Sequence, residues 1–184
     1  MRFRPLSVNG AMLIEVEPFE DERGRFSRVF SRREFEERGL ASVFTQESVG
    51  QNARAGTIRG FHFQLAPYEE AKLVNCARGS AFDVILDIRP DSPTFGKWCA
   101  VTIRGGDWAG VYVPAGCAHA YQALEDGTEI FYRMSCDYNP DASRGYRWDS
   151  PEISVDWPLA NPILSERDRS LPVFTTQHAS GLTG

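Results

Sequence analysis

Two histidines, His62 and His119, have surroundings in which an imidazole could do chemistry. His62 occurs in TIRGFHFQ and His119 in VPAGCAHAY, and in both segments a glycine lets the backbone turn or approach a ligand closely. Histidine has an unperturbed pKa of about 6.5, which suits a general base near neutral pH. Either histidine alone is more often a structural residue, so the residues around them must decide the interpretation.

The two histidine segments together resemble the halves of a cupin, a jelly-roll barrel whose metal-binding members carry a His-x-His pair. In this chain the first half contains His62-Phe63-Gln64, so the second histidine of the pair is missing. An amide such as that of Gln64 is a poor ligand for the first-row metals that imidazole favours. We therefore predict a site with no metal and no other cofactor.

A pocket without a metal can still run acid–base chemistry if a base and an acid lie on opposite sides of the substrate. A buried tyrosine is a natural proton donor, since its ordinary pKa is about 10. Lys72, in YEEAKLV, could stabilise the negative charge that develops on a carbonyl oxygen when a neighbouring carbon loses its proton. A surface lysine whose stem packs on the protein is the plainer alternative.

Arg23, Arg59 and Arg167 could bind a diphosphate, because a guanidinium matches two phosphate oxygens at once. Their spacing does not show that they converge. The chain has 184 residues, 20 Lys and Arg against 25 Asp and Glu, and a net charge of −5. This balance argues against nucleic-acid and membrane-surface binding, so a bound anion must meet a locally positive pocket. No stretch has the length of a signal peptide or a membrane span, and we expect a cytoplasmic protein.

The positioning elements are predicted to be strands. Length and ordinary composition favour one domain over residues 1–184. Between residues 57 and 138, short runs rich in β-branched and aromatic residues alternate with glycine and proline turns, which indicates an all-β sandwich or barrel. The clearest runs are AKLVNCA, AFDVILDI, WCAVTI, AGVYV and TEIFYRMS.

Residues 31–39, SRREFEERG, form the one convincing helix, with a serine cap, Glu34 three residues later and a closing glycine. Residues after Tyr138 are expected to wrap irregularly and to end in a loose tail, QHASGLTG. In AFDVILDI, Asp83 and Asp87 share one face of the strand, which faces either a lined cavity or solvent. Four cysteines without a Cys-x-x-Cys pair are predicted to be buried free thiols: Cys76, Cys99, Cys117 and Cys136.

Beyond these patterns, the chain from about Pro18 to Asp168 resembles the dTDP-4-dehydrorhamnose 3,5-epimerase family. The resemblance rests on motifs in order: DERGRFSRVF, IRGFHFQ, AKLV, FDVILDIRPDSPTFGKW, VPAGCAHAY, EIFYRMSCDYNP, YRWDSPEISVDWP and LSERD. It implies a metal-free cupin jelly roll that inverts C3 and C5 of dTDP-4-dehydro-6-deoxy-D-glucose through an enolate, in dTDP-rhamnose biosynthesis.

The resemblance implies four catalytic residues. His62 matches the base and Asp168 the carboxylate that orients it, which would also favour the imidazolium. Lys72 matches the lysine that holds the C4 oxygen, and Tyr132 the tyrosine that donates a proton from the opposite face.

The resemblance also implies the substrate contacts and a homodimer whose N-terminal strands cross to the partner subunit. Arg23 and Phe26 would then reach the neighbouring active site. The predicted substrate-binding residues are Arg59, Arg23 and Arg167 for the diphosphate, Gln46 for nucleotide or sugar, Phe26 and Tyr138 for stacking on the base, and Asp83 and His119 in the pocket. Core packing is the alternative for the two aromatic residues.

The chain departs from the family pattern around the nucleotide. The family usually has Glu at Arg28, Gln-Asp-Asn at Gln46-Glu47-Ser48, Glu at Ser143 and Lys at Arg167. These departures leave open a 3-epimerase, or the same chemistry on another nucleotide sugar. A related cupin ketoisomerase and a non-enzymatic sugar-nucleotide binding module are the remaining alternatives. A binding module would have no reason to keep all four catalytic candidates together.

Overall fold

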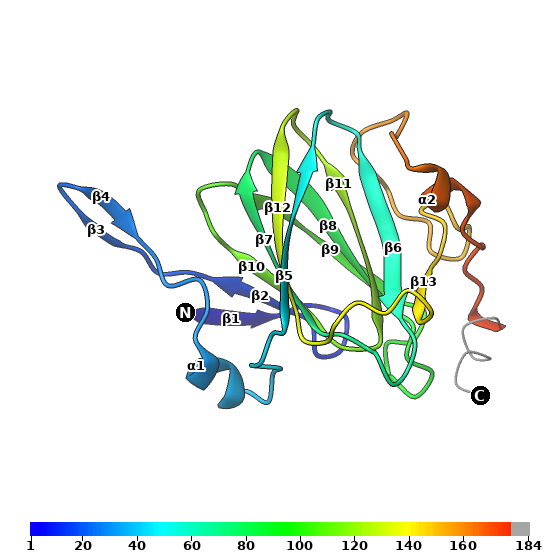
Figure 1. Cartoon of the computed structure of the whole chain (residues 1–184), viewed down its shortest axis with the longest axis horizontal. Coiled ribbons are helices and arrows are strands. Elements are labelled where there is room, and N and C mark those ends of the chain that lie inside the picture. Colours follow the sequence, from blue (N-terminus) through cyan, green and yellow to red (C-terminus); the bar gives the residue numbers. More distant parts are fainter. Residues whose placement is uncertain (178–184) are drawn as a thin grey trace.

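A computed structural model describes residues 1–177, and two facing antiparallel β-sheets dominate it (Figure 1). The first sheet consists, in spatial order, of β1 (Arg2–Pro5), β2 (Met12–Glu15), β10 (Gly110–Val113), β7 (Lys72–Arg78), β12 (Thr128–Met134) and β5 (Gln46–Asn52). The second consists of β13 (Ser143–Gly145), β6 (Ile58–Gln64), β11 (Cys117–Ala123), β8 (Ser80–Asp87) and β9 (Trp98–Arg104). The predicted all-β jelly-roll fold is confirmed.

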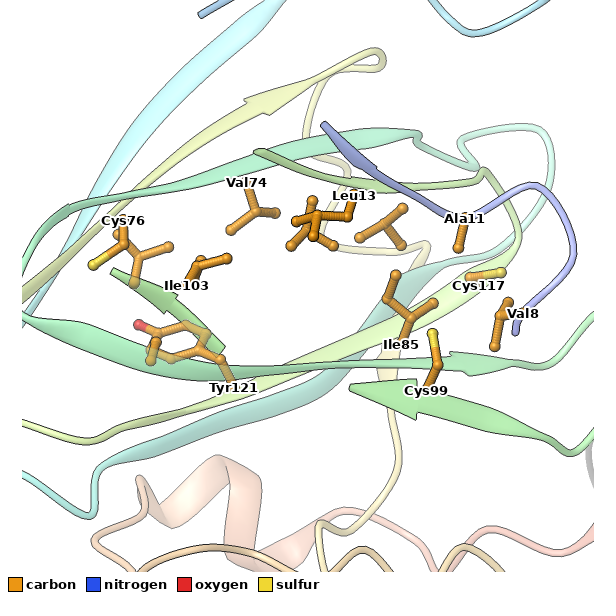
Figure 2. Packing of buried hydrophobic residues seen from close by; sticks show 14 residues of the cluster. Val8, Ala11, Leu13, Val74, Cys76, Ile85, Cys99, Ile103, Cys117 and Tyr121 are labelled. Atoms are coloured by element: carbon orange, nitrogen blue, oxygen red, sulfur yellow. The ribbon is translucent and has the colours of Figure 1, made fainter. Parts of the chain in front are cut away.

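The inner faces of the two sheets enclose an apolar cluster (Figure 2). The cluster includes Val74 on β7 of the first sheet and Ile85 on β8 and Tyr121 on β11 of the second. On β8 the alternate residues, among them Val84 and Leu86, point outward into a second cluster under the C-terminal segment. Burial on both faces explains why the β8 sequence is almost continuously apolar.

Two short helices flank the sheets, α1 (Arg32–Glu36) and α2 (Glu166–Ser170). The helix expected in residues 31–39 is confirmed in its first part, because Ser31 caps α1 by accepting a hydrogen bond from the Glu34 N–H. The irregular wrapping expected after Tyr138 holds for most of that segment, but β13 and α2 interrupt it. Of the expected loose tail, residues 178–184 lie outside the described residues. Neither helix could cross a membrane.

Two expectations about buried groups need correction. Asp83 and Asp87 are each at most 1% exposed, so the solvent-face alternative for these acids is wrong. Asp87 accepts hydrogen bonds from Arg89, Ser92 and Thr94 at one end of the barrel, which offsets the cost of burying its charge. All four cysteines are free, but Cys136 is half-buried where a buried thiol was expected.

A two-stranded hairpin, β3 (Phe19–Asp21) and β4 (Gly24–Phe26), projects away from the barrel (Figure 1). Phe19 and Phe26 are opposite each other in the hairpin and are 66% and 74% exposed. An isolated hairpin is marginally stable in water, and a pair of exposed phenylalanines indicates a contact surface. This hairpin therefore has the properties of a segment that packs against another molecule.

Strand β6 contains an irregularity between Arg59 and His62 that changes which way their side chains point. Arg59 pairs with Tyr121, and His62 pairs with His119. Three residue steps along β6 are therefore matched by only two steps along β11. In a regular strand, residues three apart point to opposite faces. The shift centres on Gly60, whose φ is +119° and whose missing Cβ would lie 2.7 Å from the Cα of Ala120.

We predict that Gly60→Ala destabilises the protein by at least about 2 kcal/mol, because the positive φ is costly for alanine and the methyl group meets the β11 backbone. Gly127→Ala is the control, since Gly127 also has a positive φ but no atom near its missing Cβ. The control should lose only about 1 kcal/mol. Urea unfolding of both variants checks this, and equal losses would show that the close approach at Gly60 is not a constraint.

Candidate active site

A cavity of about 200 Å³ opens between the two sheets at one end of the barrel. Ligand pockets for drug-sized molecules run to roughly 300–1,000 Å³, so this space suits a single ring rather than a whole nucleotide-sized ligand. Six of the predicted site residues line it: Gln46, His62, Lys72, Tyr132, Tyr138 and Arg167.

His62 lies on β6 and lines the cavity, and its ring forms a hydrogen bond with Asp168 of α2. The His62 Nε2 lies 2.6 Å from the Asp168 Oδ1, and the carboxylate side chain is only 5% exposed. Ser165 caps α2 by accepting a hydrogen bond from the Asp168 N–H at 3.0 Å, which fixes the carboxylate's backbone. The imidazole is 34% exposed and lines the cavity. Its orientation is thus set by a residue 106 positions away.

Asp168 remains ionised because its hydrogen bonds outweigh its burial. Burial alone would raise the pKa of this carboxyl, but hydrogen bonding and attraction to His62, and the bond with Ser165, hold the pKa below its ordinary value. An ionised carboxylate at this distance orients the imidazole, and a histidine oriented in this way is suited to act as a general base toward a bound molecule.

Lys72 enters the cavity from the first sheet, next to Glu70. The Lys72 Nζ lies 3.0 Å from a Glu70 carboxylate oxygen, and the two side chains are 10% and 12% exposed. The carboxylate of Glu70 lowers the free-energy cost of burying the Lys72 ammonium group. A buried lysine without such a partner would pay a higher desolvation cost. The plainer expectation of a solvated surface lysine does not fit this burial.

Tyr132 lies on β12, in the sheet opposite His62. Burial, together with a hydrogen bond to Tyr121, raises the pKa of Tyr132 well above its ordinary value, so this phenol keeps its proton at neutral pH. Tyr121 donates in turn to the Asn52 Oδ1 at 3.1 Å, and Arg59 Nε donates to the same oxygen at 3.1 Å. A chain of polar groups therefore runs from the cavity phenol to an arginine.

Asp83 and His119 lie behind the cavity and do not line it. The His119 Nε2 is 2.8 Å from the Asp83 Oδ2, and both side chains are almost fully buried. The His119 ring is edge-on to the Tyr132 ring at 6.5 Å between centroids. The predicted contact of Asp83 and His119 with a ligand stays a prediction.

The mouth of the cavity carries three of the residues at which the chain departs from the resembled pattern: Ser48, Ser143 and Arg167. Ser48 and Ser143 line it, and the Arg167 Nη2 donates to the Ser143 Oγ at 2.7 Å. Arg59 lines an adjoining hollow together with His62, Arg167 and Asp168. Two guanidinium groups therefore flank the histidine on its outer side.

Arg23 and Phe26 are not brought to this cavity by their own chain. Both lie on the projecting β3–β4 hairpin, where Arg23 forms an ion pair with Asp21 at 2.6 Å. Arg28 lines a separate hollow next to Phe26 and Glu34. The crossing to a partner subunit that the resemblance implied stays a prediction for these residues.

Sequence reasoning missed four residues around the cavity: Gln64 as a structural group, Glu70, Asn52 and Tyr121. Gln64 and Glu70 each stand two positions from a catalytic candidate, and period two puts them on the same side of an extended chain. Nothing local marked Asn52 or Tyr121. Within residues 1–177, no three His, Cys, Asp or Glu side chains group in a way that could hold a metal ion.

Comparisons with known proteins agree on one family. The family model described as dTDP-4-dehydrorhamnose 3,5-epimerase matches residues 5–176. A protein of that name from Sinorhizobium fredii is 40% identical over 173 residues, which are 94% of this chain and 89% of its own.

Solved structures resemble this chain closely. An epimerase from Mycobacterium tuberculosis has a TM-score of 0.93 and 39% identity, with 99% of this chain and 92% of that chain covered. A 3'-monoepimerase from Streptomyces bikiniensis, solved in complex with dTDP-quinovose, has a TM-score of 0.89 and 33% identity, with 97% and 91% covered. The similar structures thus include one enzyme described as a 3'-monoepimerase.

We predict that the Asp168 carboxylate stabilises the fold only when it is ionised. Because its folded pKa lies below the ordinary value of 3.8, the contribution is complete above that pH and is lost as the pH falls through the folded pKa. Asp168→Asn should therefore cost about 2 kcal/mol near neutral pH, and its deficit should shrink in acid. Urea unfolding across the acid range checks this, with the exposed neighbour Glu166→Gln as control; a constant deficit would contradict it.

Proposed function

The chain belongs to the dTDP-4-dehydrorhamnose 3,5-epimerase family, and from this premise we propose which carbons it inverts and which residues move the protons. It is an isomerase that acts on dTDP-linked 4-keto-6-deoxy sugars. The proposed substrate is dTDP-4-dehydro-6-deoxy-D-glucose, inverted at C3 and C5 to dTDP-4-dehydro-L-rhamnose.

The observation that carries the proposal is the placement of His62 and Tyr132 on opposite sheets around one small cavity. Inverting a carbon requires removal of a proton from one face and its replacement on the other. A base on β6 and a protonated phenol on β12 meet that requirement for a flat ring held between them.

In the proposed reaction, His62 removes the proton from C3, and the C–H electron pair moves into the enolate with its charge on the C4 oxygen. Asp168 stabilises the imidazolium that forms. Lys72 stabilises the enolate oxygen through its ammonium group. Tyr132 then protonates C3 from the opposite face, and solvent restores both groups. The same steps at C5 complete the reaction.

The proposed binding of the nucleotide uses groups outside the cavity, because the cavity has room for the sugar ring alone. Arg59 and Arg167 flank His62 and would bind the diphosphate, while Tyr138 at the mouth would stack on the base. Gln46 would contact sugar or nucleotide. Arg23 and Phe26 would come from the partner subunit of a homodimer, for which the exposed hairpin supplies a contact surface.

One alternative within the family has a specific observation behind it. A similar solved structure is that of a 3'-monoepimerase, and Ser48 and Ser143, which depart from the family pattern, line the cavity mouth. An altered mouth could hold the sugar so that only C3 reaches the base. The same departures, with Arg28, would also suit another nucleotide.

We expect deuterium from D₂O to enter both C3 and C5 of dTDP-4-dehydro-6-deoxy-D-glucose during turnover, as followed by NMR. Incorporation at C3 alone would assign the 3-epimerase instead. His62→Asn should slow exchange at both carbons by roughly 10²–10⁴-fold, since it removes the base.

Tyr132→Phe should separate exchange from inversion, because the base remains while the opposite donor is lost. We expect deuterium at C3 with its configuration retained. Tyr112→Phe is the control, since Tyr112 is buried in another cluster. Normal inversion by Tyr132→Phe would overturn the assignment of the acid.

If the β3–β4 hairpin crosses to the partner subunit, two variants that are inactive alone should restore activity when they form one dimer. In a heterodimer of Arg23→Ala and His62→Asn, one site would carry both changes and the other neither. The purified heterodimer should recover about half of the wild-type activity, because one of its two sites is intact. Co-expression with two affinity tags and assay of the purified heterodimer checks this; no recovery would place Arg23 in its own chain's site.

A further inference from the structure

We propose that Gln64 is a positioning residue that holds Tyr138 at the mouth of the cavity and so sets the affinity for the nucleotide. This inference rests on the proposed function in one respect, the stacking of Tyr138 on the nucleobase of the substrate. Gln64 occupies the position where a metal-binding cupin has its second histidine, and the acid–base mechanism does not use it. The side chain lines the cavity and is 4% exposed.

The Gln64 side chain links three segments through hydrogen bonds. Its Nε2 donates to the carbonyl oxygen of Tyr68 at 2.9 Å and to that of Asp137 at 3.2 Å. Its Oε1 accepts from the Asn139 N–H at 2.6 Å. The amide therefore joins the end of β6 to the loop before β7 and to the loop after β12.

The bonds on the second loop surround Tyr138. The Asp137 carbonyl belongs to the peptide group before Tyr138, and the Asn139 N–H belongs to the peptide group after it. The Tyr138 N–H donates to the Gln46 Oε1 at 2.8 Å. Two glutamine side chains thus fix the backbone of Tyr138 on both sides, whereas the residue itself is 56% exposed.

A fixed backbone beneath an exposed ring is the arrangement expected of a preorganised stacking surface. A ring held in place before binding loses less conformational freedom when a flat ligand stacks on it, and this gain appears in affinity. Free loops with exposed aromatic rings lack this advantage. Gln64 would therefore act on binding through Tyr138.

The same amide also approaches the Lys72 pair. The Gln64 Nε2 lies 3.4 Å from the Glu70 Oε2, and Glu70 holds Lys72. Two amide hydrogens serve the two shorter carbonyl bonds, so the Glu70 contact is the weakest of the three. We therefore expect loss of Gln64 to affect nucleotide binding more strongly than the chemical step.

The test compares Gln64→Met with Gln122→Met. Gln122 is a matched control because its fully buried amide also fixes a backbone segment, donating to the Leu159 carbonyl at 2.8 Å and accepting from the Leu159 N–H at 2.9 Å, and it does not line the cavity. Both variants should lose thermal stability. Only Gln64→Met should bind dTDP more weakly, by about tenfold in calorimetric titration, with KM raised by more than kcat falls.

A double variant tests whether Gln64 acts through Tyr138. In the Tyr138→Ala background, Gln64→Met should change the Kd for dTDP by less than about twofold, since coupled residues are not additive. Gln64→Glu gives a second route if Gln64→Met does not fold, because a carboxylate keeps the bond from Asn139 but cannot donate to the two carbonyls. It should weaken dTDP binding to a similar extent.

The outcomes separate this inference from the proposed function. Wild-type affinity for dTDP in a folded Gln64 variant, or a full tenfold effect in the Tyr138→Ala background, would overturn the role of Gln64 and leave the proton-transfer assignments untouched. Normal turnover by His62→Asn would overturn those assignments, and the dTDP titrations would remain interpretable.

Discussion

The hydrogen bond between His62 and Asp168 is the interaction on which the site depends. Its acceptor lies on a helix of five residues, and a helix of this length has little stability of its own. The helix is capped by Ser165, and Tyr146 and Phe174, on the segments before and after it, pack on the outer face of the second sheet. Packing on the outside of the barrel therefore orients a side chain that acts on the inside.

The two sheets divide the proposed chemistry between them. Lys72 and Tyr132 lie on neighbouring strands of the first sheet, with Met134 opposite Lys72 and Val74 opposite Tyr132, so they are diagonal neighbours on one inner face. His62 belongs to the second sheet. Because the sheets are held apart by a packed apolar cluster, the separation of base and acid is a property of the fold and not of a flexible loop.

The sequence predicted the elements whose signals are local. Short apolar runs between glycine and proline turns marked the central strands, and the serine cap marked α1. The same kind of signal, Ser165 followed three residues later by Asp168, begins α2 within the segment expected to be irregular. The sequence left open whether Asp83 faces a cavity or solvent, because its partner His119 lies 36 residues away on the neighbouring strand β11. The bonds of Gln64 join residues up to 75 positions apart, and no pattern along the chain encodes such contacts.

The arrangement separates the chemical groups from the groups that would set specificity. His62, Lys72 and Tyr132 sit on strands between packed sheets, where a small displacement would disturb several neighbours at once. Tyr138 lies in a loop and Phe26 on a projecting hairpin, which tolerate change more easily. The departures at Arg28, Ser48 and Ser143 fall near this second set. A chain of this family can therefore change which nucleotide sugar it accepts while the geometry around the ring stays fixed.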